Sequence, residues 1–265
     1  MKSRWLDFAI PILSLATFFV LWHNAIAWFA IPAYLLPSPV DVGQTFWAGY
    51  YTTGRFWPHL GTTLYQMVAG YAIGCSVALA LGALVAESRV IDRILYPFIV
   101  GLQSMPKVAL APLIIVWFGF GPQSKIVLVA LICFFPTFVN CVSGLRAANP
   151  DLVDLYRAFS ASRLSIFLNV KLPSAAGPIF AGLQIGVVLA LIGAVVGEFI
   201  AARQGLGFLI QSSTLSFDVA TMFAAIFSLA IMGVVATLIV RFIQARVVFW
   251  EGNRRATATN TAETT

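Results

Sequence analysis

The chain has 265 residues, of which 60% are hydrophobic and 10% are charged, and its mean hydropathy is +0.91. These values exclude a soluble domain, whose surface must be largely polar, and indicate an integral membrane protein surrounded by a lipid bilayer. A formal net charge of +6 would suggest nucleic-acid binding in a soluble chain. In a membrane protein basic residues more often report orientation, so no nucleic-acid partner is predicted.

Long runs without charged residues predict where the chain crosses the membrane, because roughly 20 apolar residues at about 1.5 Å each span the hydrocarbon core. Within the second run, Gly70, Gly74 and Gly82 recur along one side of the expected helix, which offers a small-residue face for close helix packing. The predicted fold is therefore all-α with six transmembrane helices, covering residues 8–28, 62–86, 94–118, 126–145, 177–201 and 219–241.

The distribution of basic residues predicts which loops face the cytoplasm. If the N-terminus is inside, most of the 16 Lys and Arg residues fall in cytoplasmic segments, and only Arg55, Lys125 and Arg203 fall outside. Because cytoplasmic loops carry the excess of Lys and Arg, this bias favours that orientation. An even number of spans then places both the N-terminus and the C-terminus in the cytoplasm.

A polar stretch between the fourth and fifth spans, residues 147–176, has the pattern of two short helices. Asn149 and Pro150 have the chemistry of an N-cap and a first helical position. Ser162 can cap a second helix, and Pro173 precedes the return to the membrane. Such a hairpin either lies on the lipid surface or docks a soluble partner. Its first helix carries an apolar stripe at i, i+3, i+4 and i+7, formed by Leu152, Leu155, Tyr156 and Phe159.

The same stretch resembles the EAA loop of ABC-importer permeases. Asp154-Leu155-Tyr156 stands where that motif has Glu-Ala-Ala, and Val170-Lys171-Leu172-Pro173 matches its hydrophobic-x-Leu-Pro ending. Ser160 stands where the motif has Gly, and it would strain the bend by roughly 1 kcal/mol if that position is left-handed. Nearly the whole chain is similar to the taurine, aliphatic sulfonate and nitrate permeases, through LLPSP at 35–39, QSMPKVALAPLIIVWFGFGPQSK at 103–125, FFP at 134–136 and GEFIAARQGLGFLI at 197–210.

The resemblance implies a type I ABC-importer permease fold in the bacterial inner membrane. It implies one transmembrane domain over 1–265, with its core at 62–246, a coupling loop at 147–176 and a disordered tail at 252–265. The implied partners are cytoplasmic ATP-binding subunits, an extracytoplasmic solute-binding protein and a second permease copy, as a homodimer. The residues that would couple the chain to the ATPase are Asp154, Leu155, Tyr156, Arg157, Phe159, Ser160 and Pro173.

The predicted function is that of a permease subunit in an ATP-driven importer for a small anion such as a sulfonate or nitrate. Related permeases also carry pyrimidine-like vitamin precursors, so such a solute stays an alternative. A secondary transporter driven by an ion gradient is the alternative from another class, and it would need several ionisable groups within the membrane. The sequence contains no G-x-x-x-x-G-K-[ST], H-E-x-x-H or G-x-S-x-G. ATP would therefore be hydrolysed by another chain, and no catalytic residue, cofactor or metal is predicted.

Lys107 and Glu198 are the ionisable candidates for the translocation path or its gate. Lys107 is the fourteenth residue from Ile94, which places it roughly 20 Å into a straight helix, and it lies between Pro106 and Pro112. It either lines the path, where its charge would favour an anion, or reaches back to an interface as an anchor. Glu198, near the outer end of the fifth span, is either a gate residue or an acid hydrated at the interface.

Overall fold

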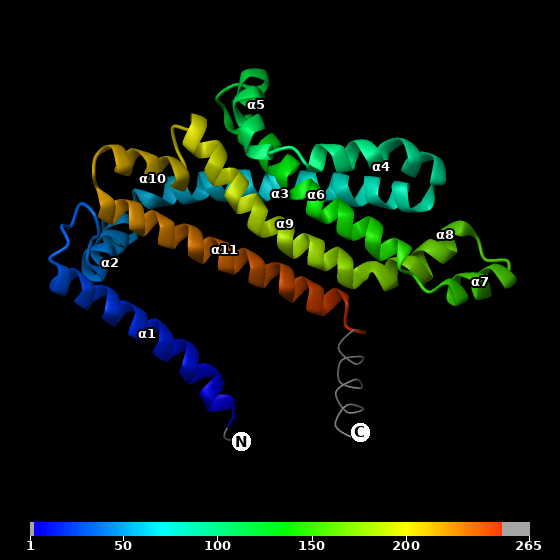
Figure 1. Cartoon of the computed structure of the whole chain (residues 1–265), viewed down its shortest axis with the longest axis horizontal. Helices are drawn as coiled ribbons and strands as arrows, with labels where there is room; N and C mark the ends of the chain where they lie inside the picture. Colours follow the sequence, from blue (N-terminus) through cyan, green and yellow to red (C-terminus); the bar gives the residue numbers. More distant parts are fainter. Residues whose placement is uncertain (1–2, 251–265) are drawn as a thin grey trace. The chain divides into compact units, whose positions relative to one another are not determined.

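The computed structural model describes residues 3–250, and within that range its regular structure is entirely helical (Figure 1). The predicted tail at 252–265 lies outside the described residues. The α-helices are α1 (Ser3–Phe29), α2 (Pro39–Trp47), α3 (Phe56–Glu87), α4 (Arg89–Gln103), α5 (Ala111–Phe118), α6 (Pro122–Arg146), α7 (Pro150–Ala158), α8 (Arg163–Ile166), α9 (Leu172–Ala201), α10 (Leu206–Leu215) and α11 (Val219–Val247). Shorter 3-10 or π segments are η1 (Ala48–Thr52), η2 (Lys107–Leu110) and η3 (Phe167–Lys171).

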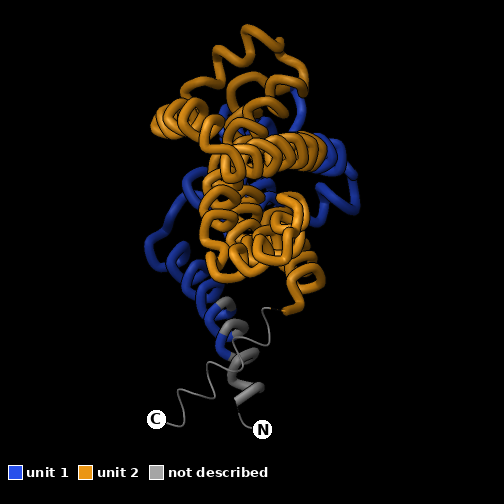
Figure 2. Tube along the Cα trace, turned by 90° about the vertical axis from the view of Figure 1, so that its right-hand side faces the viewer, with its two compact units in different colours: residues 1–62, 203–230 blue, residues 63–202, 231–265 orange. Residues whose placement is uncertain are grey.

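The chain divides into two compact units, which Figure 2 colours blue and orange. Unit 1 comprises residues 1–62 and 203–230, and unit 2 comprises residues 63–202 and 231–265. Each unit is described by itself below. Unit 2 contains the predicted coupling loop together with Lys107 and Glu198, so it holds all the candidate functional residues.

Four helical segments in the described part of the chain are long and apolar enough to cross a membrane: α3, α6, the continuous helical stretch Arg163–Ala201, and α11. A fifth is added if the bent pair of α4 and Lys107–Phe118 counts as one span. The first of the six predicted spans falls on α1, of which Ala16–Phe29 is a shorter apolar helix. The predicted fold class is confirmed, and the second, fourth, fifth and sixth spans each lie within one of these long helical segments.

The third predicted span is not a straight helix. It bends by 90° between Arg89–Gln103 and Lys107–Phe118, and Pro106 stands at the break in extended backbone, directly before η2. A proline has no backbone N–H and disfavours helical geometry in the residue before it, so a helix ends there. The depth of roughly 20 Å predicted for Lys107 assumed a continuous helix, and that assumption is wrong.

Unit 1 is held together by aromatic packing and by polar contacts between segments that are distant in sequence. The ring of Trp22 in α1 lies 5.6 Å from that of Phe223 and 6.3 Å from that of Phe227, both in α11. Arg55 donates a hydrogen bond of 2.8 Å to the hydroxyl of Thr221. Ser38 and Asp41 form a capping box at the start of α2, which satisfies backbone N–H groups that a helix leaves unpaired.

Unit 2 is built around α6, which packs against α3 on one side and α9 on another. Both contacts use glycine. In a lipid bilayer no hydrophobic effect drives two helices together, so their association depends on close packing, and a residue without a side chain allows the two backbones to approach. A Cβ atom at Gly74 of α3 would clash with the backbone oxygen of Ala130 in α6. A Cβ atom at Gly182 of α9 would lie 2.8 Å from the Cβ atom of Asn140 in α6. The small-residue face predicted for the second span is therefore an interface with α6.

Replacing Gly74 by alanine is expected to destabilise the fold, because the new methyl group meets backbone atoms of α6 that cannot rotate away. Overpacking of this kind costs about 1–3 kcal/mol. Gly61→Ala is the matched control: Gly61 lies in the same helix with open space around it, so alanine there should raise stability by about 0.5–1 kcal/mol. Thermal unfolding of the detergent-solubilised variants measures both effects, and equal midpoints would contradict this packing.

Candidate functional site

The predicted coupling loop contains two helices, α7 and α8, that each begin at a local side-chain cap, and α8 continues through η3 into α9. The side chain of Asn149 accepts a hydrogen bond of 2.9 Å from the backbone N–H of Asp151, and Pro150 is the first helical residue. The side chain of Ser162 accepts one of 3.2 Å from the N–H of Ser165. Both predicted N-caps are confirmed, and they fix where each helix begins.

Ser160 makes the bend between the two helices. Its φ angle is +57°, in the left-handed region that costs a non-glycine residue roughly 1–2 kcal/mol. The backbone N–H of Ser160 donates to the oxygen of Arg157 at 2.9 Å, and that of Ala161 donates to the oxygen of Tyr156 at 3.0 Å. These bonds close the end of α7 and hold the strained residue in place.

The inner side of the hairpin is a small apolar cluster of its own. Tyr156 is half-buried and packs there, so it points away from the remainder of the predicted stripe. Burial of these side chains lets α7 and η3 move as one body, because a packed core resists deformation. The cluster consists of Val153, Ile166 and Val170, with Tyr156 and Ala161 packed against them.

The outer side of the hairpin presents the rest of the stripe to the surroundings. We call Leu152, Leu155 and Phe159 the outer apolar face; they are 44%, 50% and 79% exposed, respectively. Beside it, Arg157 and Asp154 form an ion pair of 2.9 Å whose side chains are both largely exposed. Such a surface ion pair contributes little to stability. These two residues therefore lie at the edge of the outer apolar face and do little to stabilise the hairpin.

One ion pair joins the end of η3, directly before α9, to the end of α3. The ammonium group of Lys171 lies 2.6 Å from the carboxylate of Glu87. Pro173 follows in the first turn of α9, where a proline is tolerated because the N–H it lacks would be unpaired anyway. The hairpin therefore leads directly into a membrane-spanning helix through a continuous helical stretch.

Lys107 lies at the corner between α4 and α5, where it is half-exposed. Its ammonium group donates to the backbone oxygen of Gln103 at 2.9 Å and lies 4.5 Å from the centre of the Phe135 ring. The first contact satisfies a carbonyl freed where α4 ends, and the second is a cation-π interaction.

Glu198 is completely buried, which contradicts the interpretation of it as an acid hydrated at an interface. Its carboxylate accepts a hydrogen bond of 2.8 Å from the hydroxyl of Thr63 in α3. Burying a carboxylate costs free energy unless neighbouring groups form hydrogen bonds with it or offset its charge. The groups of unit 2 around Glu198 therefore have to stabilise its carboxylate.

Lys125, which the distribution of basic residues predicts in an outer loop, is a buried cation. It is 2% exposed, and its ammonium group donates to the backbone oxygens of Phe120 at 2.7 Å, Gly121 at 3.2 Å and Ala201 at 2.5 Å. The charge of Glu198 also acts on it electrostatically. These contacts connect the start of α6 to the end of α9. We call Lys125, Glu198 and Thr63 the buried charge cluster.

One sequence feature is related to the buried charge cluster: the residue before Glu198 is a glycine, Gly197, which indicates close packing at this position. A Cβ atom at Gly197 would lie 3.0 Å from the Cγ atom of Lys125. The missing side chain therefore makes room for the lysine stem between α6 and α9.

Comparison with known proteins places the chain in a family. Residues 70–249 match the model of the family described as binding-protein-dependent transport system inner membrane component. The riboflavin transport system permease protein RibX of Chloroflexus aurantiacus is 34% identical over 95% of this chain and 93% of its own. The formylaminopyrimidine transport permease protein ThiX of Halalkalibacterium halodurans is 31% identical over 91% and 95% of the two chains.

Two further comparisons bear on the solute class and the fold. The putative aliphatic sulfonates transport permease protein SsuC of Escherichia coli is 30% identical over 94% of each chain. A solved structure of the MetNI methionine ABC transporter in an inward-facing conformation matches with a TM-score of 0.62 and 19% identity, over 74% of this chain and 97% of the matched one. This likeness shows a type I permease fold.

Family membership decides between the classes of function left open by the sequence. It contradicts the alternative of a secondary transporter, and it makes the chain a membrane-embedded transport subunit and not an enzyme. Such a subunit works with an ATPase and a solute-binding protein. The chain belongs to the family of binding-protein-dependent transport system inner membrane components and is an ABC transporter permease subunit.

Proposed function

We propose that the hairpin at 147–176 is where the ATPase drives this permease, and that the outer apolar face is the docking surface. The supporting observation is that this face is exposed although the hairpin has a packed cluster of its own. The hairpin continues into α9 and is tied to α3 by the ion pair of Lys171 and Glu87. A movement of the docked ATPase would therefore tilt membrane-spanning helices and exchange access between the two sides.

The orientation and the assembly are part of the same proposal. An ATPase acts in the cytoplasm, so the hairpin faces that side, and both chain termini do too. The excess of Lys and Arg in the corresponding loops supports this assignment. The chain pairs with a second copy, because a single chain of this family forms only half of a pathway.

The solute that we propose is a small anion such as a sulfonate or nitrate. Lys107 carries the argument: it stands at the 90° bend between α4 and Lys107–Phe118, which together count as one broken span, and irregular backbone in a span is tolerated mainly beside protein or a water-filled cavity. Lys107 is partly exposed although its ammonium group contacts Gln103. A positive charge at such a corner favours anions.

A pyrimidine-like vitamin precursor is the second candidate. It is supported by the name of ThiX, a formylaminopyrimidine transport permease that is 31% identical to this chain, compared with 30% for SsuC. RibX, at 34% identity, is named for a different vitamin, riboflavin. Lys107 favours the first candidate and the likeness to ThiX favours the second. Because a neutral ring needs no cation for its passage, one lysine substitution separates the two.

Lys107→Met is expected to reduce anion uptake by about tenfold, in line with the loss of one charge-assisted contact. The assay reconstitutes the permease with its ATPase and binding protein in liposomes and measures uptake of labelled taurine, nitrate and a formylated aminopyrimidine. Lys107→Arg should retain most of the uptake, because it keeps the charge. Unchanged anion uptake by the Met variant would remove the lysine from the path, and uptake of the pyrimidine alone would establish the second candidate.

A further inference from the structure

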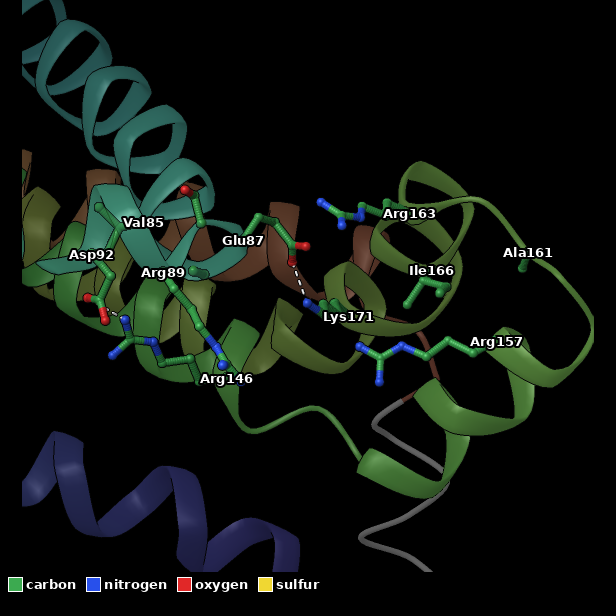
Figure 3. A pocket seen from close by; sticks show the side chains of 12 residues that line it. Val85, Glu87, Arg89, Asp92, Arg146, Arg157, Ala161, Arg163, Ile166 and Lys171 are labelled. Carbon is green, nitrogen blue, oxygen red and sulfur yellow. Dashed lines mark hydrogen bonds and ion pairs between the residues drawn. The ribbon is translucent and has the colours of Figure 1, made fainter.

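A basic pocket of about 890 Å³ lies between the hairpin and the rest of unit 2 (Figure 3). Its volume falls within the range of sites for small ligands, roughly 300–1,000 Å³. Its walls come from the end of α3, the start of α4, the end of α6, the hairpin and η3. The lining residues are Val85, Ala86, Glu87, Ser88, Arg89, Asp92, Arg146, Arg157, Ala161, Arg163, Ile166 and Lys171.

Most of the pocket's charges are already paired. Glu87 binds Lys171, and Asp92 binds Arg146, each at 2.6 Å. Arg157 binds Asp154, which is not part of the lining, at 2.9 Å.

Two arginines remain, Arg89 and Arg163. Neither has an ion-pair partner among the described residues. The pocket therefore holds two guanidinium groups that no carboxylate of the described chain neutralises.

The two arginines come from opposite walls. Arg89 is the first residue of α4, after its cap Ser88, and Arg163 is the first residue of α8. In Figure 3 the side chain of Arg163 extends from the hairpin toward the rest of unit 2, and Arg89 lies on the other side of the Glu87–Lys171 ion pair in this view. Guanidinium groups present several N–H donors in a planar fork that matches the oxygens of a phosphate group.

We propose that this pocket binds a phosphate-bearing anion between Arg89 and Arg163. Bound there, the anion links the hairpin to the start of α4 and stiffens the connection between them. None of the residues that line this pocket belongs to the proposed solute path or to the outer apolar face, which Arg157 borders. The site therefore does not depend on which solute the permease carries.

Two sources offer the same chemistry. One is the headgroup of an anionic phospholipid, since basic pockets at the cytoplasmic ends of membrane helices accommodate such headgroups. The other is a soluble phosphorylated molecule. Both would be held by the same two arginines, so one pair of substitutions tests the site and the choice of probe identifies the source.

The first arm uses the full-length chain purified without ATPase subunits, which removes the other phosphate-binding protein. Inorganic pyrophosphate is titrated by calorimetry into phosphate-free detergent solution. Wild-type chain should bind, and Arg89→Gln/Arg163→Gln should bind at least about tenfold more weakly. Arg93→Gln is the matched control, because Arg93 lies in the same helix as Arg89 and is exposed outside the pocket. It should bind as wild type does.

The second arm repeats the titration in phosphatidylcholine nanodiscs with and without phosphatidylglycerol. If the lipid headgroup is the natural occupant, phosphatidylglycerol suppresses pyrophosphate binding, and native mass spectrometry finds that lipid on wild-type chain and not on the double variant. If the occupant is soluble, the added lipid changes nothing. The single variants Arg89→Gln and Arg163→Gln replace the double variant if it elutes as an aggregate.

Equal pyrophosphate affinity and equal lipid retention in wild-type chain, the arginine variants and the control would overturn the proposal. Neither measurement involves solute uptake or ATP hydrolysis. A negative result would leave the proposed transport function standing, and a failed uptake assay would leave the anion site standing.

Discussion

Leu155→Asp/Phe159→Asp is expected to abolish coupling while the chain still inserts into the membrane. Both side chains lie on the outer apolar face, where Leu155 is 50% and Phe159 is 79% exposed, and neither belongs to the hairpin's apolar cluster, so their loss leaves that cluster intact. Apolar anchors at the centre of an interface carry most of its binding energy, commonly about 2 kcal/mol or more each. Co-purification of the ATPase should be lost, and solute-stimulated ATP hydrolysis should fall by about tenfold or more.

Leu155→Met/Phe159→Leu is the matched control, because it keeps an apolar surface at both positions. It should retain ATPase binding and most of the stimulated hydrolysis. The docking role would be wrong if the Asp variant co-purified with the ATPase as wild type does. Tyr156 is not a suitable target for this test, because it packs in the hairpin's own cluster and its substitution would also unfold the hairpin.

Features that depend on neighbouring residues could be predicted from the sequence. Asn149 and Ser162 cap helices through bonds to N–H groups two or three residues away, so their roles are contained in the local pattern. The glycines of α3 were recognised in the same way, from their spacing along one helix face. Their partner, α6, could not be identified, because spacing within one helix says nothing about which other helix approaches it.

Features that depend on contacts between segments distant in the chain could not be predicted from the sequence. The stripe of the first hairpin helix gave no reason to separate Tyr156 from Leu155, and the separation arises because α8 and η3 cover only one side of α7. Lys107 was placed by counting along a straight helix, and the 90° bend removed the basis of that count. Proline positions indicate that a helix can break, and they do not specify the angle.

Lys125 shows most clearly why the buried charge cluster could not be predicted. A lysine at the start of an apolar run is expected at an aqueous interface, where its charge costs little. Burial follows here only because the end of α9 supplies the oxygen of Ala201 and because Gly197 leaves room for the lysine stem. Both belong to a segment about 70 residues away in sequence.

Lys125→Met is expected to lower the free energy of unfolding by about 3 kcal/mol or more, because each buried backbone oxygen left without a donor costs about 1–3 kcal/mol. The methionine has a similar length but cannot donate. The oxygens of Phe120, Gly121 and Ala201 would lose their shared donor, and Glu198 would keep a buried charge without the nearby cation. Thermal unfolding in detergent, followed by size-exclusion chromatography, measures the loss.

Lys107→Met is the matched control, because Lys107 is only partly buried. The midpoint of thermal unfolding of this variant should differ little from that of the wild-type chain.

A double-mutant cycle with Glu198→Gln tests whether the two charges act together. Glu198→Gln keeps the shape of the side chain and can still accept from the hydroxyl of Thr63, so it should cost less than Lys125→Met. If the charges compensate each other, Lys125→Met/Glu198→Gln will be more stable than the sum of the single effects predicts, by roughly 0.5–3 kcal/mol. Strict additivity would mean that Lys125 acts only through the three backbone oxygens, and that the cluster links α6 to α9 by hydrogen bonds and not by charge.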